Sequence, residues 1–137
     1  MADETPFRDP EEATREFVLD CFKDLEDFGA ANVGNFPGPG LAEKLPYVSV
    51  DLVDGPADYF EASPIMAIDV FAGRKDLAKK LAWELQLYFM RYPQVVEVQG
   101  RAFVLDFAEC LSIPHDVPWD DTKVRRQSAR YQITSRR

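Results

Sequence analysis

Residues 65–92, IMAIDVFAGRKDLAKKLAWELQLYFMRY, change from one hydrophobic repeat to another. In 65–73 apolar residues recur at every second position on each side, which is typical of a strand. After Gly73 the repeat lengthens to three and four residues, which predicts a helix over 74–92 that ends before Pro93. A strand followed by an amphipathic helix predicts a sheet with helices packed on it.

The rest of the chain extends this arrangement in both directions. A first helix is predicted from Pro10 to about Phe28, because apolar residues recur at helical spacing after two glutamates that suit a helix N-terminus. Alternation predicts further strands over 45–55, 94–99, 102–113 and 129–136, with a proline-rich loop over 113–121. We expect an α+β fold: a mixed or antiparallel sheet of about five strands, with both helices on one face.

Length and composition indicate one domain. With 137 residues, 46% of them apolar, and ten Phe, the chain is able to bury a sizeable core without a disulfide or a metal. We expect a flexible arm over 1–10 and a single α/β domain over 11–137. Cys21 and Cys110 are expected to be small buried hydrophobic residues. We expect no signal peptide and no membrane partner, since no run of 18 apolar residues occurs.

The sequence contains no recognisable catalytic motif. It has no glycine-rich phosphate loop and no serine in a nucleophile elbow, and His115 is the single histidine. His115 lies near three aspartates in HDVPWDD, residues 115–121, which permits a divalent ion, but an acidic surface loop is the favoured interpretation. We therefore expect no catalytic residue, no metal and no cofactor.

Three acids, Asp51, Asp69 and Asp106, interrupt strands that are otherwise rich in Val, Ile and Phe. In a suitable register they would share the sheet face that points away from the helices. An ordinary solvated face is the favoured interpretation. The alternatives are a carboxylate pair for acid–base chemistry and an acidic wall that an oligomer repeats by symmetry.

Apolar side chains also occur where a monomer does not need them. Trp83, Leu87 and Met90 lie on the helix 74–92 nearly opposite its core face. We expect them to be covered, either by the N-terminal arm or the first helix of the same chain, or by another subunit. Phe36 lies in a loop rich in glycine and proline, where it either packs onto its own domain or anchors a neighbour.

Charge is divided unevenly along the chain. Residues 123–137 carry six basic residues and no acid, whereas 1–122 carry 24 acids and ten basic residues, giving a net charge of −8 overall. The basic segment alternates like a strand. It is interpreted as an edge strand whose charges discourage stray pairing, or as one side of head-to-tail contacts between identical copies. A DNA contact through Arg125 and Arg126 is a third possibility.

Four stretches together resemble a known family: LPYVSVDLV (45–53), SPIMAIDVFAGRKDLAKKLAWELQ (63–86), VLDFAECLSIPHDVPWDD (104–121) and KVRRQSARYQITSRR (123–137). In their order and spacing they are similar to tail terminator proteins of long-tailed bacteriophages, particularly those infecting actinobacteria. The resemblance implies a lambda-type tail terminator: a small α/β protomer that forms a hexameric ring with no enzymatic activity and no cofactor.

The resemblance also implies partners and a place. The expected partners are five further copies in a homo-hexamer, the major tail tube protein, the head–tail connector or stopper protein, and genomic DNA that passes through the lumen without specific binding. The expected location is the tail or neck of the virion, assembled in the host cytoplasm. The alternatives are another neck protein, such as a connector or stopper, and, with less support, a DNA-binding module that uses the basic C-terminal strand.

Two sets of residues are candidates for these roles. The candidates for protein interfaces are Phe36, Trp83, Leu87, Met90, Trp119, Arg125, Arg126, Arg130 and Arg136. The candidates for an acidic lumen wall are Asp51, Asp69 and Asp106.

Overall fold

A computed structural model describes residues 9–54, 61–119, 121 and 123–136. The helices are α1 (Pro10–Cys21) and α2 (Lys75–Met90), with short 3₁₀ turns η1 (Ala30–Asn32) and η2 (Leu41–Glu43). The strands are β1 (Val33–Gly34), β2 (Tyr47–Asp54), β3 (Glu61–Ala62), β4 (Ile65–Ala72), β5 (Gln94–Val98), β6 (Arg101–Leu105), β7 (Phe107–Val117) and β8 (Arg125–Arg136). The predicted flexible arm falls almost wholly outside the described residues.

The main sheet is built around its last strand. Its order is β1–β2–β4–β8–β7, and the two-residue β3 pairs with the far end of β8. β1 runs parallel to β2, and every other pairing in this sheet is antiparallel. The expected α+β sheet is therefore confirmed. The prediction that the basic C-terminal segment forms an edge strand is wrong, because β8 is hydrogen-bonded to β4 on one side and to β7 on the other.

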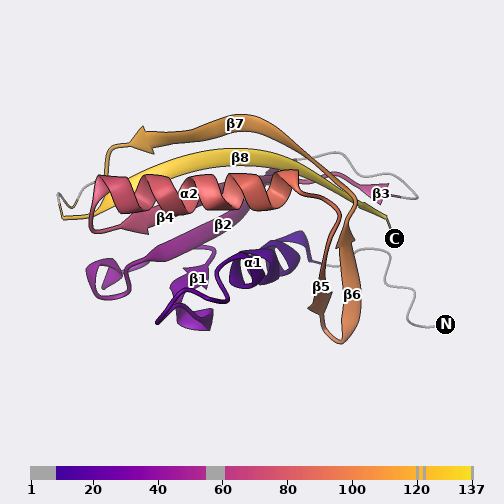
Figure 1. Cartoon of the computed structure of the whole chain (residues 1–137), viewed down its shortest axis with the longest axis horizontal. Coiled ribbons are helices and arrows are strands. Elements are labelled where there is room, and N and C mark those ends of the chain that lie inside the picture. The colour runs from indigo at the N-terminus through magenta and orange to yellow at the C-terminus, as the bar shows by residue number, and fades with distance from the viewer. Residues whose placement is uncertain (1–8, 55–60, 120, 122, 137) are drawn as a thin grey trace.

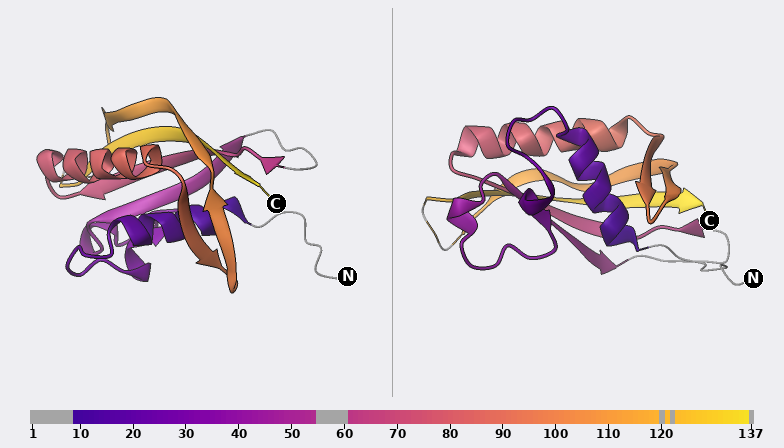
Figure 2. Two further views of the ribbon diagram at one scale, coloured as in Figure 1. Left: turned by 45° about the vertical axis from the view of Figure 1, so that its right-hand side comes forward. Right: turned by 90° about the horizontal axis from the view of Figure 1, so that it is seen from below.

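Both helices cover one face of this sheet, as predicted (Figure 1, Figure 2). α1 packs on β2 and on the β5–β6 hairpin, and α2 packs on β4, β8 and β7. Alternate strand residues point into this layer, so one continuous core forms between sheet and helices. Its largest fully buried members are Tyr131, Phe17, Phe89, Met66, Leu81, Leu85, Leu105, Ile133, Val18, Val48 and Val50.

The first helix is shorter than its apolar repeat suggests. α1 ends at Cys21, although Leu25 and Phe28 continue the predicted stripe and still pack against the core. Acidic residues crowd the predicted last turns, and a helix C-terminus, which carries partial negative charge, disfavours them. The chain turns instead, with Asp27 in the left-handed region at φ 62°, and the Phe22 and Phe28 rings meet edge to face at 5.1 Å.

The predicted long strand over 102–113 is two strands. It breaks at Asp106, where β6 leaves to form a separate hairpin with β5 and β7 joins the main sheet. β7 then continues to Val117, through the segment predicted as a proline-rich loop. Pro114 is tolerated because β7 lies at the edge of the sheet and its register shifts between Ser112 and His115.

A braced loop follows β1 and carries Phe36. The Tyr47 hydroxyl donates to the Phe36 carbonyl at 2.9 Å, and Lys44 Nζ donates to the Pro37 carbonyl at 3.0 Å. Asn32, which precedes β1, donates from Nδ2 to the Lys44 carbonyl at the far end of the loop, at 3.1 Å. These bonds fix the backbone that displays the Phe36 ring.

Gly34 leaves room for this brace, and its replacement is a test. A Cβ at residue 34 would overlap the Tyr47 hydroxyl. We expect Gly34→Ala to lower the free energy of unfolding by about 1–3 kcal/mol, because overlap with a rigid ring is relieved only by backbone shifts. Urea unfolding measures this change. In a Tyr47→Phe background the same substitution should cost clearly less, and an equal cost in both backgrounds contradicts the explanation.

Candidate functional site

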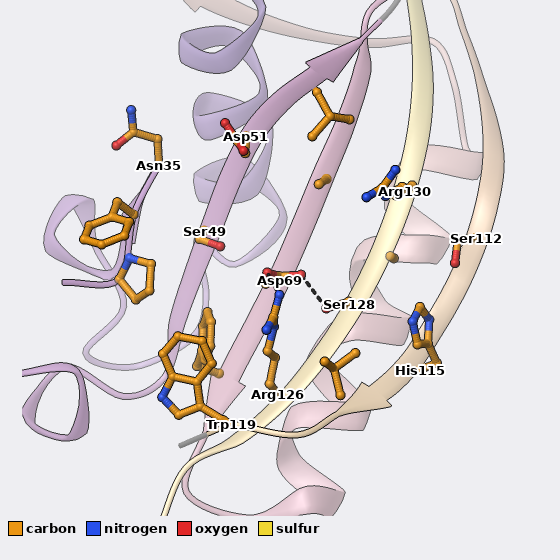
Figure 3. Close-up of a pocket in the computed structure, with 17 residues that line it drawn as sticks. Asn35, Ser49, Asp51, Asp69, Ser112, His115, Trp119, Arg126, Ser128 and Arg130 are labelled. Carbon is orange, nitrogen blue, oxygen red and sulfur yellow. Dashed lines mark hydrogen bonds and ion pairs between the residues drawn. The ribbon is translucent and has the colours of Figure 1, made fainter. Parts of the chain in front are cut away.

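The sheet face opposite the helices forms a hollow of about 520 Å³ (Figure 3). Its floor follows from strand register, since directly paired residues point to the same side. Three rows cross the strands in the order β2, β4, β8 and β7. These rows are Tyr47–Phe71–Arg126–Val117, Ser49–Asp69–Ser128–His115 and Asp51–Ala67–Arg130–Ser112.

Asp69 is the centre of a hydrogen-bonded group in the middle row. Its Oδ2 accepts from Arg126 Nη2 at 2.8 Å, and its Oδ1 accepts from the Ser128 hydroxyl at 2.5 Å. Only 17% of the Asp69 side chain and 27% of the Arg126 side chain are exposed. The ion pair is therefore partly shielded from water, and Asp69 adds no net charge to this face.

Arg126 is held from a second direction by aromatic rings. Its guanidinium carbon lies 5.4 Å from the Trp119 ring centroid and 5.9 Å from that of Phe71. Its Nε is buried without a hydrogen-bond partner within the part of the chain that the structure describes. Arg126 was predicted as an interface residue, but its pair with Asp69 and its aromatic contacts lie within the chain.

The other strand acids do not form a single acidic wall. Asp51 lines the hollow and is exposed, but Arg130 lines the same hollow, two strands away in the same row. Neither has an ion pair within the described residues. The prediction that Asp106 shares this face from mid-strand is wrong, because Asp106 lies in the break between β6 and β7, where its backbone N–H bonds to the Thr134 carbonyl.

Two aromatic candidates border the hollow in different ways. Trp119 is half-buried against a small second core that Leu41, Tyr47, Phe71 and Val124 form. Phe36 is 72% exposed, so the interpretation that it packs onto its own domain is wrong. An exposed aromatic ring on a fixed backbone is suited to a protein contact, because the braced loop has little backbone entropy left to lose on binding.

The three apolar candidates on α2 also differ. Met90 is half-buried against the core, Trp83 is half-buried, and Leu87 is 52% exposed. α1 does not cover these three side chains, because it contacts α2 on the side of the helix that carries Glu84 and Tyr88. Lys75, Lys79 and Lys80 precede them on α2 and are exposed. The sequence interpretation missed these lysines, although they stand at helical spacing from Trp83 and Leu87.

The basic strand contributes less free charge than its sequence indicates. Arg125 and Arg130 are exposed, whereas Arg126 is paired. The side chain of Arg136 lies outside the described part of the chain, and its backbone pairs with Glu61. In the described ranges, no three His, Cys, Asp or Glu side chains gather as metal ligands would. No helix there has the length and apolar character that crossing a bilayer requires.

A polar contact inside the helix layer joins α1 to α2. The Tyr88 hydroxyl donates to Asp20 Oδ2 at 2.7 Å, and burial together with this carboxylate raises the pKa of Tyr88. The neighbouring thiol, Cys21, has its pKa raised to about 12 by burial and by nearby Glu84 and Asp20. Cys21 and Cys110 are both half-buried and pack against the core, slightly more open than predicted.

Comparison with known proteins gives one kind of likeness. No family model matches the chain, and no curated protein matches it. Among solved structures, the chain is similar to a chain in the virion of a native gene transfer agent particle, with a TM-score of 0.50 and 14% sequence identity. The match covers 94% of this chain and 100% of the other. At this identity the likeness concerns the fold, which the two chains share from end to end.

The Asp69–Arg126 pair predicts a stability change. Asp69→Ala should lower the free energy of unfolding by about 1–3 kcal/mol, because Arg126 then stays partly buried without its counter-charge. Urea unfolding measures the loss. Arg130→Ala, four residues beyond Arg126 on β8 and without an ion pair among the described residues, serves as the control and should change stability by about 0.5 kcal/mol or less. Equal effects of the two substitutions would count against the assigned role of the pair.

The raised pKa of Cys21 predicts a slow thiol reaction. In a Cys110→Ser variant at pH 8, Cys21 should react with a disulfide reagent at least tenfold more slowly than a free cysteine, because its raised pKa leaves little of it as thiolate. Unfolding in urea should restore the ordinary rate. A fast reaction in the native protein would show that Cys21 is open to water.

Proposed function

We propose that this chain is a virion structural protein of the phage type, and that six copies form a ring that ends the tail tube and joins it to the head-side connector. The observation that carries the proposal is the end-to-end fold likeness to a chain of a gene transfer agent virion. The ordered sequence resemblance to phage tail terminators supports it independently.

The surface of the protomer is consistent with assembly. Phe36 is displayed on a braced loop, and Leu87 is exposed on a helix whose other side is buried. Large apolar side chains at such positions favour protein contacts. We assign Phe36 and the Trp119 border of the hollow to contacts with the tube or the connector, and the outer side of α2 to contacts within the ring.

Net charge supports passage of DNA without tight binding. Each copy carries −8, so a ring of six carries −48, which repels phosphate. Among the three predicted lumen acids, Asp51 remains the candidate for the wall, because Arg126 neutralises Asp69 and Asp106 lies apart from both. The paired state of Arg126 also weakens the alternative of a DNA-binding module.

The proposal is tested by mass and by particle shape. Native mass spectrometry of the 15.6 kDa chain, alone and with tail tubes, should find hexamers of about 94 kDa. Particles made without the chain should contain tubes longer than the set length and unattached to heads. If tubes keep their normal length and only joining fails, the chain is a connector or stopper. A chain that is monomeric at every concentration and absent from purified tails contradicts the proposal.

A further inference from the structure

The outward side of α2 carries a continuous row of side chains. Lys75, Lys79, Trp83 and Leu87 follow one another at steps of four residues, and Lys80 lies beside them. Residues four apart are neighbours on a helix, so this row runs about 18 Å along the surface. We call these five residues the α2 flank. It is basic in its first half and apolar in its second.

Nothing within the described chain neutralises this surface. Lys75, Lys79 and Lys80 are exposed and form no ion pair there, since the nearby Asp76 pairs with Arg74 at 3.1 Å. Figure 1 shows α2 in front of the sheet with no described element in front of it. Three exposed positive charges on the same side of the helix as an exposed leucine, in a chain of net charge −8, favour a partner that supplies acid.

The chain itself displays a matching acidic surface. Asp24, Glu26 and Asp27 are exposed in the turn after α1, and none has an ion pair within the described residues. We call these three residues the acidic turn. Its backbone is held by hydrogen bonds from Leu25 N to the Phe22 carbonyl and from Phe28 N to the Leu25 carbonyl, and by the Phe22–Phe28 contact. A hydrogen-bonded turn therefore holds these three acids at the surface.

We propose that the α2 flank of one copy binds the acidic turn of a second copy, as the heterologous contact of the ring. This inference rests on the proposed function, because two different patches on each copy close into a ring only when the rotation permits. The lysines pair with the carboxylates, and Leu87 with Trp83 supplies the apolar part of the contact. Such a contact orients the copies through charge and is weakened by salt.

The sheet edges favour a contact through side chains over one through strand pairing. On one side, β1 covers the start of β2, and the Glu11 carboxylate accepts from the Leu52 N–H at 2.8 Å. On the other side, β7 contains Pro114 and two register shifts, which are devices that block pairing with a further strand. Adjacent copies are therefore expected to meet through the helix layer.

Charge reversal gives a sharp test. The flank variant is Lys79→Glu with Lys80→Glu, and the turn variant is Asp24→Lys with Glu26→Lys, which leaves the left-handed Asp27 in place. Each variant alone places like charges across every contact. An equimolar mixture restores opposite charges at every contact of an alternating ring. A control, Lys123→Glu with Arg125→Glu, makes the same charge change as the flank variant at exposed residues outside α2.

Sedimentation and native mass spectrometry measure the protein concentration at half assembly. We expect each variant alone to need at least tenfold more protein than the parent chain for half assembly. The mixture and the control should each reach half assembly within threefold of the concentration that the parent chain needs. Circular dichroism should find all variants folded, since every altered side chain is exposed.

The outcomes separate the two proposals. If the parent chain forms rings and both variants form them equally well, the flank–turn contact is wrong while the ring stands. If both variants fail and the mixture fails as well, the two surfaces do not meet each other, and the inference is again wrong. A parent chain that never assembles, alone or on tubes, contradicts the ring itself.

Discussion

The position of β8 in the middle of the sheet is the constraint on which the rest of the structure depends. Its inward residues, Ala129, Tyr131 and Ile133, are buried in the main core. Its outward residues, Arg126, Ser128 and Arg130, form one line of the hollow. Arg125 and Arg130 on this strand keep their charges in water, whereas only 27% of the Arg126 side chain is exposed. The basic segment is therefore stable here because Asp69 on β4 meets it in register.

This placement gives a physical reason for the uneven charge along the chain. The net charge of 1–122 is −14 and that of 123–137 is +6, and part of this difference is used inside the fold. Arg126 pairs with Asp69 between the aromatic rings of Phe71 and Trp119, where water does not screen the attraction fully. The head-to-tail interpretation placed the basic segment at a contact between copies, but Arg126 already has its acidic partner within the chain.

The hydrophobic periodicity of the sequence was sufficient to predict the fold class. It failed where packing against a distant part of the chain overrode a local preference. The alternation in 65–73 and the repeat in 74–92 became β4 and α2 almost as predicted, because each also packs on the core. Leu25 and Phe28 continued a helical stripe, yet they reach the core from a turn. Pro114 indicated a loop, but the edge of a sheet accepts proline. Neither outcome is visible without knowing which elements become neighbours.

The candidate site was harder to predict, because strand register decides which side chains share a row. Asp51 and Asp69 were grouped correctly on the outer face, whereas Asp106 was grouped with them through a strand that breaks at that residue. The pairing of Asp69 with Arg126 spans 57 residues and depends on an alignment that no local pattern encodes. Topology decides which charges meet over such a distance. The sequence therefore singled out Asp69 and Arg126 separately but did not predict that they pair.

The charges of this chain fall into two groups: those that pair within the protomer and those that stay exposed to a partner. Arg126 and Asp69 are largely shielded and paired with each other, so exchanging this pair for an intermolecular one would leave a partly buried charge without its partner, at a large cost. Lys75, Lys79 and Lys80 are exposed and unpaired among the described residues, so a partner's carboxylates meet them at a small desolvation cost. A surface that combines inexpensive charge pairing with an exposed leucine favours reversible, oriented association. We therefore propose the α2 side for contacts between copies, whereas the Asp69–Arg126 pair stabilises the sheet within each protomer.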